Sequence, residues 1–217
     1  MNHMFLKRNE GFKWYSDGKI YCKGYLYINN NLFLEGEDLL AYLTNLSELN
    51  EVKKMLEKSD GFYSIIFNHS EYTALISDKL ASFPLFYKLE NEDYIILDYI
   101  PFQDKPKIDY DSVNEFLFAG YPIGSRTLLK DFNKLKSSEI VVLSKNSTKS
   151  KIECYYDHGH KYSFEELDYS YFENQLAAIT TNFTKKLIQS VGEKTIIIPL
   201  SGGYDSRYIL TALKKEK

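Results

Sequence analysis

Residues 60–67 read DGFYSIIF, a turn signal followed at once by an apolar run. Asp60-Gly61 is a turn pair, whereas residues 62–67 are almost continuously apolar. A run with apolar side chains at odd and even positions alike is typical of a strand that is buried on both faces. We therefore predict that residues 62–67 form a fully buried strand of a packed domain.

Further strands are expected on both sides of this run. Residues 19–28 are rich in β-branched and aromatic side chains and run into three asparagines, which is typical of a strand that ends in a turn. Three segments of similar length, counted from Thr73, succeed one another with polar turns between them and favour an antiparallel meander. The expected strands are residues 73–77, 84–87 and 94–97, followed by closing strands at 139–143 and 152–156 around the polar turn 144–150.

Two stretches have helical spacing. From Glu37 to Lys58 apolar residues recur three or four positions apart, which predicts one or two amphipathic helices. Residues 111–118 form a second helical stretch, with Ser112 as a candidate cap and Gly120 as the stop signal. The apolar positions are Leu39, Leu40, Leu43, Leu46, Val52, Met55 and Leu56 in the first stretch, and Val113, Phe116 and Leu117 in the second. We expect both stretches on the outside of two stacked sheets.

The composition changes after the last expected strand. His, Gly, Ser and charged residues predominate between positions 157 and 166, and we place a linker at residues 158–167. The linker separates a first domain, residues 1–157, from a second segment, residues 168–217. The second segment opens with a long amphipathic helix that Gly192 ends, with apolar positions Phe172, Leu176, Ile179, Phe183, Leu187 and Val191.

The composition excludes several classes of protein. Of the 217 residues 44% are hydrophobic and 26% charged, which excludes a wholly disordered or collagen-like chain. With 27 Lys and Arg against 30 Asp and Glu the net charge is −3, which offers no global field for a polyanion, so we expect no nucleic-acid partner. No apolar run approaches the roughly 18 residues that cross a bilayer, and residues 1–8 lack the apolar core of a secretory signal. We therefore expect a cytoplasmic protein without a membrane partner.

Cysteine and histidine usage gives no metal site. Cys22 and Cys154 lie 132 positions apart and form neither a metal-spaced pair nor a disulfide framework. Both are expected to pack as small buried thiols. His158 and His160 flank a glycine without Cys, Asp or Glu at ligand spacing, which favours a solvated linker over a metal pair.

Residues 195–213 carry the clearest chemical signal. TIIIPL at residues 195–200 predicts a short buried strand, SGGYDS follows at residues 201–206, and residues 207–213 have helical spacing. A strand, a glycine turn and a helix start form a phosphate cradle, because glycines let the backbone approach an anion and the helix start has unpaired N–H groups. Asp205 has the wrong charge for a phosphate ligand, so we interpret it as a helix cap or as a holder of Mg²⁺. The alternative is a plain loop without function.

The loop differs from two common nucleotide-binding motifs. It lacks the Gly-Lys-Ser or Gly-Lys-Thr of the Walker loop and the third glycine of the dinucleotide fingerprint. It resembles instead the SGGxDS pyrophosphate loop of the N-type ATP pyrophosphatases. The resemblance implies that Asp205 holds Mg²⁺ through phosphate, and that ATP and its pyrophosphate are bound by Leu200, Ser201, Gly202, Gly203, Asp205, Ser206 and Arg207.

The rest of the chain adds a second resemblance. Residues 60–67, 78–87, 127–135 and 155–157 resemble, in that order, the amidotransferase half of asparagine synthetase, and together they span most of the chain. The resemblance implies an α+β fold: an αββα sandwich of antiparallel sheets of the N-terminal-nucleophile type, a linker, and the first elements of an α/β ATP pyrophosphatase domain. The implied activity is an ATP-dependent amide-forming ligase that adenylates a carboxylate and releases AMP and pyrophosphate. ATP and Mg²⁺ are then the cofactors, a carboxylate substrate and an amine donor the partners, and a homodimer is left open.

The amidotransferase half departs from its family. A class II glutaminase needs Cys as its first mature residue, whereas position 2 is Asn2, and Cys22 lies inside an expected strand. The family's Asn-Gly-Glu-Ile-Tyr-Asn segment has no convincing counterpart, and Lys79 with residues 81–83 departs from its Arg-Leu-Gly-Ile-Arg. We therefore expect no catalytic residue in this half and a lost glutaminase.

The second segment is short for a synthetase domain. About 50 residues follow the linker, whereas a doubly wound domain needs several strands with crossover helices. We expect the chain to be the front part of a longer protein and to bind ATP weakly or not at all on its own. Two other functions stay open: a docking or scaffold module of a larger biosynthetic enzyme, and a tRNA-modifying ATP pyrophosphatase, for which a basic surface or paired cysteines would be expected.

The first testable expectation concerns glutamine. Because Asn2 stands where the nucleophile is required, the protein should not hydrolyse glutamine, and diazo-oxo-norleucine should not label it. Intact-mass spectrometry after incubation with this electrophile measures the outcome. A covalent adduct at Cys22 would contradict the expectation.

Overall fold

The computed structural model describes residues 2–8, 11–29, 32–46, 48–159 and 168–216. They fall into two compact units, Met1–His158 (unit 1) and Gly159–Lys217 (unit 2). The two units are described separately below, each by its own elements.

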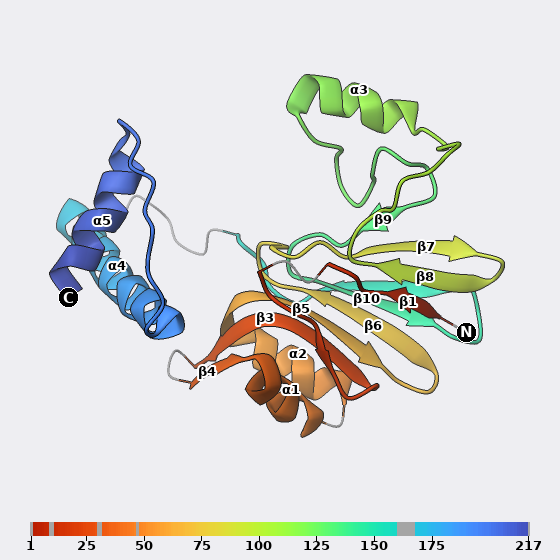
Figure 1. Ribbon diagram of the computed structural model, residues 1–217, viewed down its shortest axis with the longest axis horizontal. Helices are drawn as coiled ribbons and strands as arrows, with labels where there is room; N and C mark the ends of the chain where they lie inside the picture. The colour runs from red at the N-terminus through yellow and green to blue at the C-terminus, as the bar shows by residue number, and fades with distance from the viewer. Residues whose placement is uncertain (1, 9–10, 30–31, 47, 160–167, 217) are drawn as a thin grey trace. The chain divides into compact units, whose positions relative to one another are not determined.

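A seven-stranded antiparallel sheet is the centre of unit 1 (Figure 1). Its strand order is β11-β10-β6-β5-β3-β2, and β4 also pairs with β3. The strands are β2 (Tyr15–Ser16), β3 (Ile20–Ile28), β4 (Leu32–Glu35), β5 (Ser59–Asn68), β6 (Tyr72–Ser77), β10 (Glu139–Ser144) and β11 (Ser150–Cys154). The predicted strands at 19–28, 62–67, 73–77, 139–143 and 152–156 are therefore confirmed, with small shifts at their ends.

The second sheet has four strands in the order β1-β8-β7-β9. They are β1 (His3–Phe5), β7 (Phe86–Glu90), β8 (Asp93–Leu97) and β9 (Asn133–Lys134). β1 and β8 are parallel, whereas β8 with β7 and β7 with β9 are antiparallel. The predicted meander is wrong at one step, because β6 and β7 belong to different sheets.

A buried carboxylate explains the change of sheet. Asp78 is fully buried, and its side chain accepts hydrogen bonds from the backbone N–H of Tyr63 at 3.0 Å and of Leu80 at 2.7 Å. It also accepts from the backbone N–H of Ser82 at 3.1 and 3.2 Å, while Ala81 adopts a left-handed backbone with φ of 53°. These bonds hold residues 78–82 in a tight turn that directs the chain away from β6.

Two apolar cores lie on opposite faces of the larger sheet. On one face α1 (Gly36–Thr44) and α2 (Leu49–Glu57) pack against β3 and β5, as Figure 1 shows, with Leu39, Leu43, Val52 and Leu56 buried among side chains of the sheet. On the other face Ile66, Leu75, Val141 and Leu143 pack against Leu85, Tyr87, Tyr94, Ile96 and Leu135. The predicted strand is buried on both faces at residues 63–67, whereas Phe62 is 40% exposed. The two stacked sheets are as predicted, and residues 37–58 form two helices.

The helix α3 (Tyr110–Ala119) exists as predicted but begins and packs differently (Figure 1). Its cap is Asp109, whose side chain accepts from the backbone N–H of Asp111 and Ser112, so Ser112 is not the cap; Gly120 ends it with φ of 83°. The predicted apolar face is exposed: Leu117 is 75% accessible. Among the described residues α3 makes no extensive contact with either sheet, so it does not supply the fourth layer of an αββα sandwich.

Unit 2 consists of α4 (Tyr169–Val191) and α5 (Tyr204–Glu216) with their connection. Both predicted helices are confirmed, but the predicted strand at residues 195–200 is wrong: no described strand pairs with it, and Ile197 is 86% exposed. The apolar face of α4 is open too, because within the described part of unit 2 only α5 packs on α4. None of the described helices is long and apolar enough to cross a membrane.

The tight pairing of β3 with β5 is tested at Gly24. A Cβ at this position would lie 2.0 Å from the Phe62 carbonyl oxygen, and its φ is 94°. Gly24→Ala should lower the free energy of unfolding by about 2–5 kcal/mol, the sum of a left-handed backbone and an overpacked core. Gly18→Ala is the matched control, because Gly18 has φ of 89° but nothing within 4 Å, so it should cost only about 1–2 kcal/mol. Equal losses in urea unfolding would contradict this account.

Candidate functional site

Ser201 and Ser206 come together at the start of α5. Their hydroxyl oxygens lie 3.2 Å apart, and Ser206 Oγ also accepts from the backbone N–H of Ser201 at 3.3 Å. The N–H of Gly203 donates to Ser201 Oγ at 3.2 Å. The loop predicted from the sequence is therefore a closed turn that carries two hydroxyls at the N-terminus of a helix.

The two glycines leave open space beside this turn. Neither Gly202 nor Gly203 has a positive φ, so backbone strain does not require glycine here. A Cβ at Gly202 would meet nothing within 4 Å, and one at Gly203 would lie 3.3 Å from Ser201 Oγ. The space beside Gly202 fits the close approach of an anion to the backbone.

Asp205 lies in the first turn of α5 and is exposed. Its carboxylate has no hydrogen-bond partner among the described residues, so the interpretation of Asp205 as a helix cap is not supported. No cluster of three or more His, Cys, Asp or Glu occurs within the described residues, so a metal ion here would depend on further oxygen ligands. Mg²⁺ is commonly held by one or two carboxylates together with substrate phosphates, and this donor set fits that pattern.

Arg207 and Leu200 complete the predicted set. Arg207 Nη2 donates to the Gly202 carbonyl oxygen at 2.6 Å, and its guanidinium lies 5.8 Å from the centre of the Tyr204 ring. Arg207 thus links the first turn of α5 to the Gly202 carbonyl group and stabilises the turn. Leu200 is 60% exposed.

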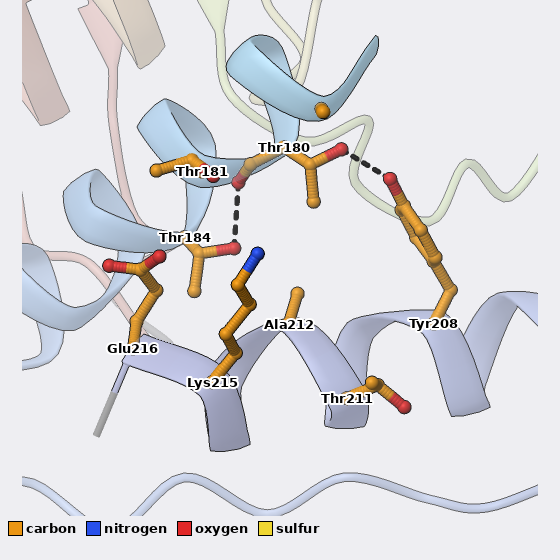
Figure 2. A pocket seen from close by; sticks show the side chains of 9 residues that line it. Thr180, Thr181, Thr184, Tyr208, Thr211, Ala212, Lys215 and Glu216 are labelled. Atoms are coloured by element: carbon orange, nitrogen blue, oxygen red, sulfur yellow. Dashed lines mark hydrogen bonds between the residues drawn. The ribbon is translucent and has the colours of Figure 1, made fainter. Parts of the chain in front are cut away.

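A cavity of about 190 Å³ lies between α4 and α5 (Figure 2). It is lined by Ala177, Thr180, Thr181, Thr184, Tyr208, Thr211, Ala212, Lys215 and Glu216. Thr184 Oγ1 donates to the Thr180 carbonyl oxygen at 2.8 Å, and the Thr180 hydroxyl is hydrogen-bonded to the Tyr208 hydroxyl. Because these hydroxyls already form hydrogen bonds to the helix backbone and to each other, we interpret the cavity as a packing defect and not as a binding site.

Neither Asn2 nor Cys22 is placed as a nucleophile in unit 1. Asn2 Nδ2 donates to Thr73 Oγ1 at 3.0 Å, and Asn2 Oδ1 accepts from the backbone N–H of Tyr94 at 3.4 Å, so this side chain ties the two sheets together. Cys22 is fully buried, and burial, with the nearby charge of Asp17, raises the pKa of its thiol to about 12. The prediction of a buried thiol at Cys22 is confirmed.

The same prediction is wrong for Cys154. Cys154 is exposed, because it lies on the edge strand β11, and its Sγ donates to the Tyr156 carbonyl oxygen at 3.1 Å. His158 Nε2 is 3.0 Å from the Lys79 carbonyl oxygen, within hydrogen-bond distance. His160 lies outside the described residues.

A buried polar cluster in unit 1 was not predicted. It lines a second cavity of about 190 Å³ formed by Arg8, Trp14, Lys23, Ser82, Phe83, Pro84 and Asp98. Asp98 is 3% exposed and accepts from Trp14 Nε1 at 2.8 Å and from the backbone N–H of Arg8 at 2.7 Å. Lys23, 4% exposed, donates to the Arg8 carbonyl oxygen. Lys23, within the largely apolar run 20–28, is the feature of the sequence that could have indicated this cluster, since a buried ammonium group requires polar partners.

Two solved structures are similar to parts of this chain. No protein-family model matches the chain, and no curated protein matches it. The glutamine phosphoribosylpyrophosphate amidotransferase of B. subtilis, solved with ADP and GMP, matches with a TM-score of 0.37 and 10% identity over 70% of this chain and 31% of that chain. The allosteric regulatory enzyme of purine biosynthesis matches with a TM-score of 0.37 and 12% identity over 93% of this chain and 44% of that chain. The chain spans less than half of either structure, and such TM-scores do not establish a shared fold.

The different burial of the two cysteines predicts their reactivity. At pH 8 a thiol-specific disulfide reagent should modify Cys154 rapidly and leave Cys22 unmodified, because only the thiolate reacts and the pKa of Cys22 is raised to about 12. Cys154→Ser should abolish the rapid reaction, and after unfolding in urea two thiols should react in the unsubstituted chain and one in the variant. Rapid modification of Cys22 in the folded Cys154→Ser variant would contradict the structure.

Proposed function

We propose that this chain is part of an asparagine-synthetase-like, ATP-dependent ligase that forms an amide bond, and that its loop at residues 201–207 binds the pyrophosphate of ATP. The observation that carries the proposal is the turn itself: two hydroxyls 3.2 Å apart, a helix N-terminus and an exposed carboxylate lie within six residues. Helix N-termini with nearby hydroxyls favour phosphate groups. The sequence resemblance supplies the choice of ATP over other anions.

The carboxylate of Asp205 gives the loop its metal dependence. A carboxylate next to a phosphate is repulsive unless a cation lies between them, because like charges at short range disfavour each other. Mg²⁺ between Asp205 and the phosphate oxygens would remove this repulsion and stabilise the charge of the departing pyrophosphate. Ser201, Ser206 and the N–H groups of the first turn would orient the same oxygens.

Unit 1 would then serve the ligase without hydrolysing glutamine. Asn2 connects the two sheets, and Cys22 is a buried thiol with a raised pKa, so neither provides a thiolate. The amine would come from the substrate itself or from free solution. A docking or scaffold module for the rest of the enzyme is the second candidate for unit 1, and the exposed apolar face of α3 favours it.

Two substitutions separate metal binding from phosphate binding. In the full-length protein that contains this chain, Asp205→Asn should abolish Mg²⁺-dependent exchange of pyrophosphate into ATP and leave the fold intact, because an exposed carboxylate in a first helical turn contributes only about 0.3–1 kcal/mol to helix stability. Gly203→Val places a branched side chain where the backbone approaches phosphate, so ATP binding should fall with or without Mg²⁺. Exchange is measured with the twenty amino acids as candidate carboxylates, and ATP binding by calorimetry.

Glu193→Gln is the matched control, because Glu193 is an exposed carboxylate of unit 2 outside the loop, and it should change neither quantity. Unchanged exchange and unchanged ATP binding in both loop variants would support the plain-loop alternative and contradict the proposal.

A further inference from the structure

β11 is an edge of the seven-stranded sheet in the described residues. It pairs with β10 alone, and four of its five residues are exposed; Ile152 is 51% accessible. An uncovered edge strand presents a row of unpaired backbone donors and acceptors to another strand. This edge is therefore a surface that can accept a partner.

The hydrogen-bond pattern shows which backbone groups face outward. The N–H of Tyr155 donates to the Ser138 carbonyl oxygen at 2.9 Å, and the N–H of Ser144 donates to the Lys149 carbonyl oxygen at 3.2 Å. Since bonding alternates along an antiparallel pair, the odd-numbered residues 149–155 face β10. The N–H and C=O groups of Ser150, Ile152 and Cys154 therefore point away from β10.

We propose that β11 pairs antiparallel with β11 of a second copy of this chain, across a two-fold axis at Ile152, so that the two larger sheets become continuous. Residues whose numbers sum to 304 then lie opposite each other. Ile152 faces Ile152 of the second copy and exchanges both backbone hydrogen bonds with it. Ser150 pairs with Cys154 of the second copy in the same way.

Charge complementarity favours a second copy of this chain as the partner of β11. Lys151 and Glu153 project from the same face of β11, so each Lys151 lies directly opposite a Glu153 of the second copy, twice in the symmetric pair. Opposite charges at directly facing positions stabilise a strand pair, whereas like charges destabilise it. A strand with this self-complementary order is suited to its own copy more than to an unrelated edge.

Other registers fail on the same observations. An axis at Lys151 would place Lys151 opposite Lys151 of the second copy, and an axis at Glu153 would place Glu153 opposite Glu153, so both bring like charges together. An axis at Ser150 would place Lys149 against Lys151 of the second copy. An axis at Cys154 would require pairing by Tyr155, which is 6% exposed and hydrogen-bonded within unit 1 to Tyr63 and Ser77.

Engineered disulfides test the register. Ser150→Cys places a thiol opposite the native Cys154 of the second copy, so mild oxidation should give a covalent dimer on a non-reducing gel. Residues 150 and 154 of one strand lie about 13 Å apart and cannot bridge within a chain. The unsubstituted chain is the control and should stay uncrosslinked, because its two Cys154 residues are as far apart. No dimer in the variant, or equal crosslinking of the control, would overturn the proposal.

A charge exchange tests the same contact without covalent chemistry. By sedimentation velocity the unsubstituted chain should form a reversible dimer, and Lys151→Glu or Glu153→Lys alone should weaken it on the order of tenfold, because two like-charge pairs replace two opposite ones. The double exchange, Lys151→Glu with Glu153→Lys, should restore dimer formation. Circular dichroism checks that each variant is folded. A monomer at every accessible concentration, or a double variant as weak as the single ones, would show that Lys151 only protects the edge.

Discussion

The nine-residue ladder between β3 and β5 is the interaction on which unit 1 depends. It runs without interruption from Ile20 opposite Phe67 to Ile28 opposite Ser59. Along β5 the side chains of Ile65 and Ile66 enter opposite cores, one covered by α1 and α2 and the other by the smaller sheet. Gly24 permits the close approach of the two backbones, because a Cβ there would collide with the Phe62 carbonyl oxygen. The two cores thus share one pair of strands.

Buried polar groups then determine how the chain enters and leaves this pair. Asp78 binds three backbone N–H groups of its surroundings and sends the chain from one sheet to the other. Asp98 binds Trp14 and the backbone of residues 7–8, which holds the N-terminal segment against the sheets. Both carboxylates are nearly inaccessible, and each is compensated by several donors, as a buried charge requires. These bonds connect elements that are distant in sequence.

The sequence could predict the features that depend on local patterns, but not those that depend on contacts between residues distant in the chain. Strands and helices were recognised where the apolar period is local, as at residues 62–67 and 172–191. The change of sheet after Ser77 and the parallel pairing of β1 with β8 depend on distant partners, which no local period contains. Residues 195–200 have strand-like composition, but a strand needs a neighbour, and the described part of unit 2 supplies none. In the candidate site the two serines and Asp205 were recognised from their order, whereas the bond from Arg207 to the Gly202 carbonyl was not.

The central claim is that the turn at residues 201–207 is a Mg²⁺-dependent site for the pyrophosphate of ATP. It is tested most directly by titrating the ¹⁵N-labelled full-length protein that contains this chain with pyrophosphate and observing the backbone amide resonances of Gly202, Gly203 and Asp205. The account predicts chemical-shift changes at these three amides that require Mg²⁺ and disappear in the Asp205→Asn variant. Unchanged resonances, or the same changes in that variant, would contradict it.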